Sequence, residues 1–429
     1  MSIREALAIL LLSVSGIAAA AELAQSNTKH LGVATCASSV CHGKLTAQSG
    51  RDVALNEYQI WSHQDYHSRA FRDLINPQSQ AIAAKLGLAS AATSKLCLDC
   101  HADNVPASLR GPKFQLSDGV QCEACHGGAE KWIETHAQKS APHSDNVARG
   151  MYPSEQPLRR AELCLSCHMG TRDKFATHAI MGAGHPRLRF ELQVFTFNQP
   201  AHVQIDADYV QRKGRIDNMN LWVTGQIENA RRYLELLQSR LTLADSFLPE
   251  FALYDCFGCH HPIDRDKQRW SRARAGAGIE PGTLRLQKYH MVMLQAITEV
   301  LAPDSLAEFV TATDGLVQAG HTSVASVQAA AQKLHAWIDA RDGWTSRQYS
   351  RDDIAKIRKT VLRYASEDRA SDFGAAEQVV MGVDSLSYAA DDHDRHKAAL
   401  DSLYNAVKSP SAFDPTQFAG VARSVQSQF

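Results

Sequence analysis

Every cysteine of the chain lies in one of five short motifs that end on a histidine. Four of them have the pattern C-x-x-C-H: Cys97–His101, Cys122–His126, Cys164–His168 and Cys256–His260. The first motif, Cys36–His42, is a longer variant with four residues between its cysteines. The pattern C-x-x-C-H is typical of covalent haem attachment, in which both thiols form thioethers with the haem. The histidine that follows then binds the iron as its first axial ligand.

We therefore predict five covalently bound haem c groups. The predicted thioether cysteines are Cys36, Cys41, Cys97, Cys100, Cys122, Cys125, Cys164, Cys167, Cys256 and Cys259, and the predicted proximal iron ligands are His42, His101, His126, His168 and His260. Disulfide bonds and zinc ribbons are alternatives for paired cysteines. Neither alternative needs a histidine directly after every pair, so the pattern favours haem. The first motif is less regular, because two extra residues must bulge between its thioethers.

The second axial position of each iron decides what the haem does. A second histidine gives an electron carrier, whereas an open position lets small molecules bind. Among the fourteen further histidines we predict five distal ligands: His67, His136, His178, His185 and His261. His67 and His136 lie in helical patterns near haem motifs, and the glycine before His185 lets the backbone approach a flat macrocycle. His261 directly follows a proximal histidine and is expected to face a neighbouring haem.

Other possible ligands have weaker sequence support. His63, His143 and His202 are secondary candidates for distal ligands. We predict no ligand role for the histidines of the C-terminal part, which are His290, His321, His335, His393 and His396. Met169 and Met181 are also disfavoured, because histidine is plentiful near them.

The N-terminus predicts export of the chain. Arg4 precedes an apolar run from Ala6 to Ala20, and the alanines at 18–20 offer a cleavage site, as in a secretory signal peptide over residues 1–21. A retained membrane anchor is the alternative, but the run is short for a membrane-spanning helix. We therefore expect a periplasmic protein. The formal net charge is −1, so no basic surface indicates a nucleic-acid partner.

The elements that position these motifs are expected to be mainly α-helical, with little regular sheet. We predict a pentahaem cytochrome domain over residues 22–268 and an α-helical C-terminal domain over residues 269–429. Three apolar stripes at helical spacing run over residues 223–241, 324–338 and 354–365. Ser350 and Asp353 form the pattern of a capping box before the last stripe.

The motifs around the third and fourth haem sites resemble those of cytochrome c-554 and its relatives. The likeness lies in Gly119–Gly127 and in Cys164–Gly170 followed by His178 and the segment Ala183–Leu188. This wider group of multihaem cytochromes includes hydroxylamine oxidoreductase and the pentahaem nitrite reductases, and the resemblance covers about residues 30–265. It implies closely stacked haem pairs, mostly bis-histidine ligation and electron transfer. It also implies His67, His136, His178 and His185 as distal ligands.

The chain departs from these relatives in three ways. It has a fifth motif and a long helical C-terminal part that the tetrahaem cytochrome lacks. It has no C-x-x-C-K site, which removes the usual catalytic haem of the nitrite reductases. Nothing in it indicates the tyrosine crosslink of hydroxylamine oxidoreductase.

Two functions remain open at this point, together with a third that is compatible with the first: a haem-bearing interaction protein whose C-terminal helices dock a partner enzyme or a membrane quinol oxidase. The first is an electron carrier that relays electrons between redox protein partners, membrane-bound ones included. The second is an oxidoreductase that acts on a small nitrogen or sulfur compound at one five-coordinate haem, with Arg187, Arg189 or His202 as nearby groups.

Overall fold

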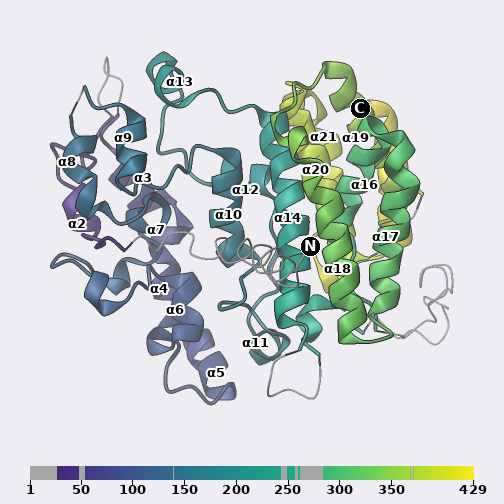
Figure 1. The fold of residues 1–429 in the computed structure, drawn as a ribbon, viewed down its shortest axis with the longest axis horizontal. Helices are drawn as coiled ribbons and strands as arrows, with labels where there is room; N and C mark the ends of the chain where they lie inside the picture. Colours follow the sequence, from purple (N-terminus) through teal and green to yellow (C-terminus); the bar gives the residue numbers. More distant parts are fainter. Residues whose placement is uncertain are drawn as a thin grey trace, which may run out of the picture. The chain divides into compact units, whose positions relative to one another are not determined.

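The computed structural model describes residues 27–47, 54–138, 140–242, 249–256, 259–260, 284–367, 369–370 and 372–429. Within these ranges the regular structure is helical (Figure 1). Strand pairing there is limited to two isolated bridges, between His30 and Arg110 and between Tyr254 and Leu286. The prediction of a mainly α fold without a regular sheet is confirmed.

The chain forms two compact units. Unit 1 contains residues 1–155 and 200–214, and unit 2 contains residues 156–199 and 215–429. The first three cysteine motifs therefore belong to unit 1, while the fourth and fifth belong to unit 2 together with the C-terminal helices. The signal peptide and the domain boundary after residue 268 both lie outside the described residues, and both stay predictions.

Unit 1 consists of short helices and loops. Its helices are α2 (Val33–Cys36), α3 (Glu57–Gln64), α4 (Ala70–Leu74), α5 (Pro77–Lys85), α6 (Lys95–His101), α7 (Cys122–His126), α8 (Ile133–His136), α9 (His143–Ala148) and α13 (Ala207–Lys213). Its apolar clusters are small: one is built around Leu74 and Leu98, and another around Trp132 and Met151. Clusters of this size bury little apolar surface, which is expected where macrocycles supply part of the core.

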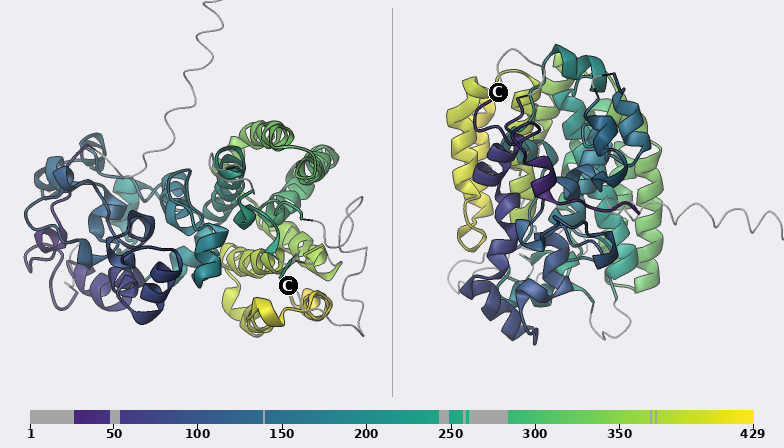
Figure 2. Two further views of the ribbon diagram at one scale, coloured as in Figure 1. Left: turned by 90° about the horizontal axis from the view of Figure 1, so that it is seen from below. Right: turned by 90° about the vertical axis from the view of Figure 1, so that its left-hand side faces the viewer.

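Unit 2 is built from longer helices. They are α10 (Pro157–His168), α11 (His178–Ala183), α12 (Leu192–Asn198), α14 (Asn218–Arg240), α16 (Tyr289–Leu301), α17 (Leu306–Ala319), α18 (Val324–Asp339), α19 (Arg351–Ser366), α20 (Phe373–Ala389), α21 (Lys397–Ala406) and α22 (Pro415–Val425). The left view of Figure 2 looks nearly along several of these helices, which lie side by side.

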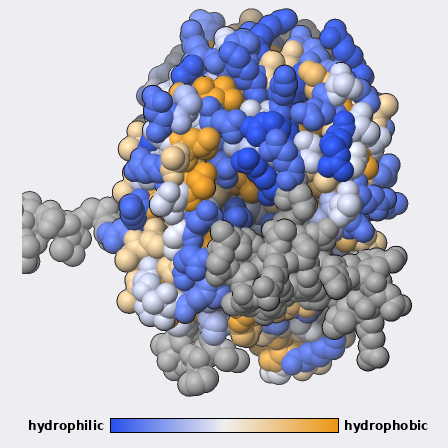
Figure 3. Space-filling view, turned by 90° about the vertical axis from the view of Figure 1, so that its right-hand side faces the viewer, coloured by the Kyte–Doolittle hydropathy of each residue, from blue (hydrophilic) through white to orange (hydrophobic). Residues whose placement is uncertain are grey.

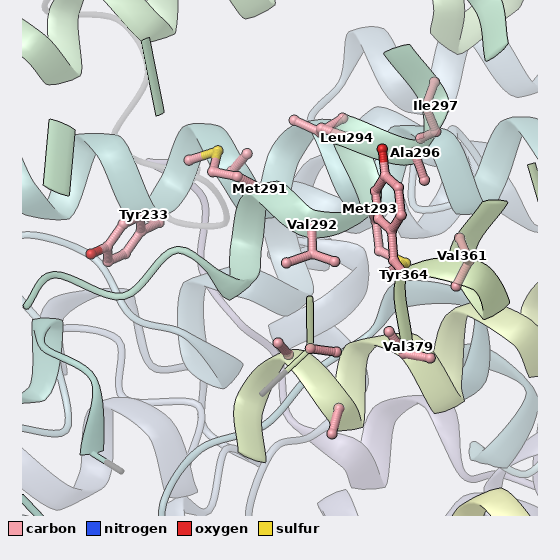
Figure 4. Close-up of a cluster of buried hydrophobic side chains, with 14 of the residues drawn as sticks. Tyr233, Met291, Val292, Met293, Leu294, Ala296, Ile297, Val361, Tyr364 and Val379 are labelled. Carbon is pink, nitrogen blue, oxygen red and sulfur yellow. The ribbon is translucent and has the colours of Figure 1, made fainter. Parts of the chain in front are cut away.

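Helix α16 lies at the centre of the core of unit 2. Residues Met291–Leu294 are all buried, as are Ala296 and Ile297, so the helix is covered on every side. Figure 4 shows these side chains close to Val361 and Tyr364 of α19 and Val379 of α20.

The three apolar stripes of the sequence coincide with helices. The first is α14, which buries Trp222 and Leu237 completely, and the other two are α18 and α19. The capping box is also confirmed: the Asp353 amide donates to Ser350 Oγ, and the Ser350 amide donates to the Asp353 carboxylate, each over 3.0 Å. On the face of unit 2 in Figure 3, small groups of hydrophobic residues lie among hydrophilic ones. None of the helices in the described ranges is long and apolar enough to cross a membrane.

Candidate haem sites

Three of the five motifs occupy a helix that ends at the proximal histidine. These helices are α6, α7 and α10. Within a helix, positions i, i+3 and i+4 lie on one face. Both thiols and the imidazole of a C-x-x-C-H motif therefore point to the same side, as a macrocycle held by two thioethers and an axial bond needs.

The other two motifs reach a similar local geometry through turns. In the first motif the His42 amide donates to the Cys36 carbonyl oxygen over 3.1 Å, so the longer loop folds back onto its first cysteine. In the fifth motif the Cys259 and His260 amides donate to the Cys256 carbonyl oxygen, over 3.2 Å and 2.7 Å. The two extra residues of the first motif are thus accommodated in a tight loop.

Hydrogen bonds fix the rings of two proximal histidines. His42 Nδ1 lies 3.0 Å from a carboxylate oxygen of Glu57, and His101 Nδ1 lies 3.0 Å from the Ala70 carbonyl oxygen. The hydrogen bond to Glu57 is the main cause that raises the pKa of His42. In both rings Nδ1 carries the proton toward the acceptor, so Nε2 is the nitrogen left to bind iron.

The first facing pair of imidazoles joins His42 and His136 in unit 1. Their Nε2 atoms are 3.5 Å apart, their ring centroids are 5.8 Å apart, and their planes differ by 15°. The distance between the centroids exceeds the distance between the Nε2 atoms by about one ring diameter. Both Nε2 atoms therefore lie between the rings, near the line that joins the two centroids. Metal–imidazole bonds are roughly 2 Å long, so this arrangement fits an iron between the two nitrogens after a small separation.

A second pair of neighbouring imidazoles is formed by His126 and His202, also in unit 1. Their ring centroids are 6.3 Å apart and their planes are nearly perpendicular, at 81°. Burial, followed by the nearby His202, lowers the pKa of His126 to about 3, which keeps its imidazole neutral. A neutral imidazole is the form that binds metal.

A third pair of neighbouring imidazoles, His178 and His260, lies in unit 2. The ring centroids are again 6.3 Å apart, with an angle of 37° between the planes. The backbone amide of His178 donates to Glu250 over 2.8 Å, and Phe251 contacts the His178 ring edge-on at 5.6 Å. The start of α11 is thereby fixed opposite the fifth motif.

The remaining predicted distal ligands have the following places. His67 lies in a short 3₁₀ helix, with Nδ1 2.9 Å from the buried Asp65 carboxylate. His185 follows α11, with Nδ1 2.7 Å from the Pro186 carbonyl oxygen. In both rings Nε2 points away from this hydrogen bond. His261 lies outside the described residues. All three stay predictions.

His202 was only a secondary candidate in the sequence, yet its ring neighbours that of a proximal histidine. It comes from residues 200–214, the segment that returns to unit 1 after part of unit 2. No local pattern around His202 signals this return, because the contact depends on tertiary structure.

His30 is a contrasting case that does not fit a haem. Its ring is fully buried, with Nδ1 2.7 Å from Asp103, and its Nε2 lacks a hydrogen-bond partner among the described residues. The six imidazoles of the three pairs are all partly or fully exposed, as a macrocycle between them requires. Nε2 of His30 has no open space beside it, so we assign His30 a structural role.

The thiols of the first and third motifs are neighbours. Helices α2 and α7 pack together, and the Cys36 and Cys122 thiols interact with each other. This contact, followed by burial, raises the pKa of Cys122 well above its usual value. Two macrocycles attached here would adjoin at their thioether edges.

Paired thiols followed directly by histidine are the pattern typical of c-type cytochromes. The comparison with protein families is more specific. Residues 35–127 match the family described as cytochrome c554 and c-prime, so the chain carries a domain of this family over the first three motifs. The family implies covalent haem c and suggests electron transfer. No curated protein and no solved structure matches the chain.

Proposed function

We propose that the chain is a periplasmic electron-transfer cytochrome that carries five haem c groups and relays electrons between a donor protein and an acceptor protein. The three pairs of neighbouring imidazoles, each with one motif histidine, are the observation that carries this proposal. An iron with two imidazole ligands has no position for a substrate, so such haems transfer electrons rather than catalyse a reaction.

In this proposal each pair holds one iron: His42 with His136, His126 with His202, and His178 with His260. The irons of the second and fourth motifs bind His101 and His168, and His67 and His185 are the predicted distal ligands that remain for them. Each haem, when bound, supplies a one-electron couple. The chain sets its spacing, ligands and surroundings.

Two properties of the chain support a close series of haems. The packing of α2 against α7 brings the first and third motifs together in unit 1, so haems bound there would be neighbours. In unit 2 the fourth and fifth motifs share one compact body, which also contains the C-terminal helices. Electrons therefore have short steps available within each unit.

Spectroscopy of the purified holoprotein tests the proposal. We expect an intact mass with five covalent haems, low-spin signals from all oxidised irons, and no binding of carbon monoxide after reduction. A high-spin signal from one haem together with carbon monoxide binding would favour the small-molecule oxidoreductase instead. A mass with four haems would remove the first motif from the set.

A further inference from the structure

Glu191 is a fully buried acid in unit 2. It caps the N-terminus of α12, where its carboxylate accepts hydrogen bonds from the amides of Gln193 (3.2 Å) and Val194 (2.8 Å). It also accepts from Ser385 Oγ of α20 (2.9 Å) and from the amide group of Gln226 of α14 (3.4 Å). All four donors are neutral, and among the described residues no base forms an ion pair with it. Such burial without a counter-charge makes ionisation costly.

Glu191 lies next to the aromatic residue whose ring covers His168, a predicted iron ligand. Phe190, the preceding residue, stacks on His168 with ring centroids 5.0 Å apart. Phe195 of α12 contacts the same imidazole edge-on at 5.3 Å. Glu191 therefore caps the helix that packs against His168, but does not itself touch that ring.

We propose that Glu191 binds a proton when the haem attached at Cys164 and Cys167 is reduced, and releases it on oxidation. This inference rests on the proposed function. One electron comes from the donor protein and one proton comes from water. The carboxylate becomes a carboxylic acid, and the net charge of the site is the same before and after reduction.

The sign of the pH dependence of the haem potential follows from the charges involved. Burial raises the pKa of Glu191 to about 7, and Asp384 of α20 contributes in the same direction. The other titratable neighbours are Tyr404 of α21, which interacts electrostatically with Glu191, and Arg189, which pairs with Glu377 at 3.6 Å. An added electron repels the carboxylate and raises its pKa further. The haem potential should therefore fall as the pH rises above about 7, and be constant well below it.

Potentiometric titration of the holoprotein between pH 5 and pH 9 tests the proposal, with dithionite as the reductant. One haem component of the wild type should change by up to about 59 mV per pH unit, which is a tenfold change in the one-electron equilibrium. Glu191→Gln should make that component independent of pH and hold it at the value the wild type reaches in acid. The matched control is Glu228→Gln, because Glu228 is also buried but is paired with Arg231 at 2.6 Å.

A second variant covers the case in which Glu191→Gln fails to fold. Ser385→Ala removes one donor to the carboxylate, so it should move the pH-dependent region to higher pH. An unchanged slope in Glu191→Gln, or an equal loss of slope in Glu228→Gln, would overturn the inference. If the holoprotein lacks low-spin haems altogether, the proposed function has failed. If all haems are low-spin but Glu191→Gln leaves the pH dependence of the haem potential unchanged, only this inference has failed.

Discussion

Replacing His202 with alanine should open one iron of the cytochrome. In unit 1 the centroid of this ring lies 6.3 Å from the centroid of the His126 ring, a separation that fits one iron with two imidazole ligands. We expect one haem in five to become high-spin, and the reduced variant to bind one carbon monoxide per chain, against none in the wild type. Electron paramagnetic resonance and a carbon monoxide titration measure these two quantities.

His321→Ala is the control, because His321 is an exposed histidine for which we predict no ligand role. It should leave every haem low-spin. Added imidazole should restore the low-spin signal of His202→Ala by filling the vacated position. If His202→Ala stays fully low-spin while His67→Ala opens the haem attached at Cys122 and Cys125, the pairing of His126 with His202 is wrong and His67 is the ligand of that iron.

Three further changes test separate parts of the structure. Glu57→Gln weakens the hydrogen bond to His42 Nδ1 by about 1.5 kcal/mol, so the potential of the first haem should rise by roughly 60 mV in a redox titration. Gly225→Ala should lower the free energy of unfolding by about 1–3 kcal/mol in urea, because its new Cβ would lie 2.6 Å from Leu192 Cβ. The double variant with Leu192→Gly, which removes that Cβ, should recover part of that loss, whereas an additive loss would contradict the clash. Ser350→Ala breaks the capping box of α19 and should cost about 1 kcal/mol in the same assay.

The sequence predicted what depends on local pattern. A cysteine pair and a histidine at helical spacing carry their chemistry within five residues, and the apolar stripe of α14 determines which face is buried. The family match over residues 35–127 implies covalent haem c. The number of haems and their axial ligands stay predictions.

Contacts between distant segments could not be predicted in this way. His202 has an unremarkable local sequence, and only the return of residues 200–214 to unit 1 brings it opposite His126. The local sequence around Glu191 likewise indicates only an ordinary helix-capping residue. Its burial depends on Ser385 and Gln226, which lie far along the chain.

The divided construction of unit 1 affects the order in which the protein can mature. Synthesis proceeds from the N-terminus, so residues 27–155 emerge first, while α13 and His202 emerge only after the fourth motif. A haem attached early at Cys122 and Cys125 would wait for its second imidazole until residue 202 has arrived. A fragment that ends at residue 155 would keep three attachment motifs but lack that ligand. An expression fragment of unit 1 must therefore include residues 200–214.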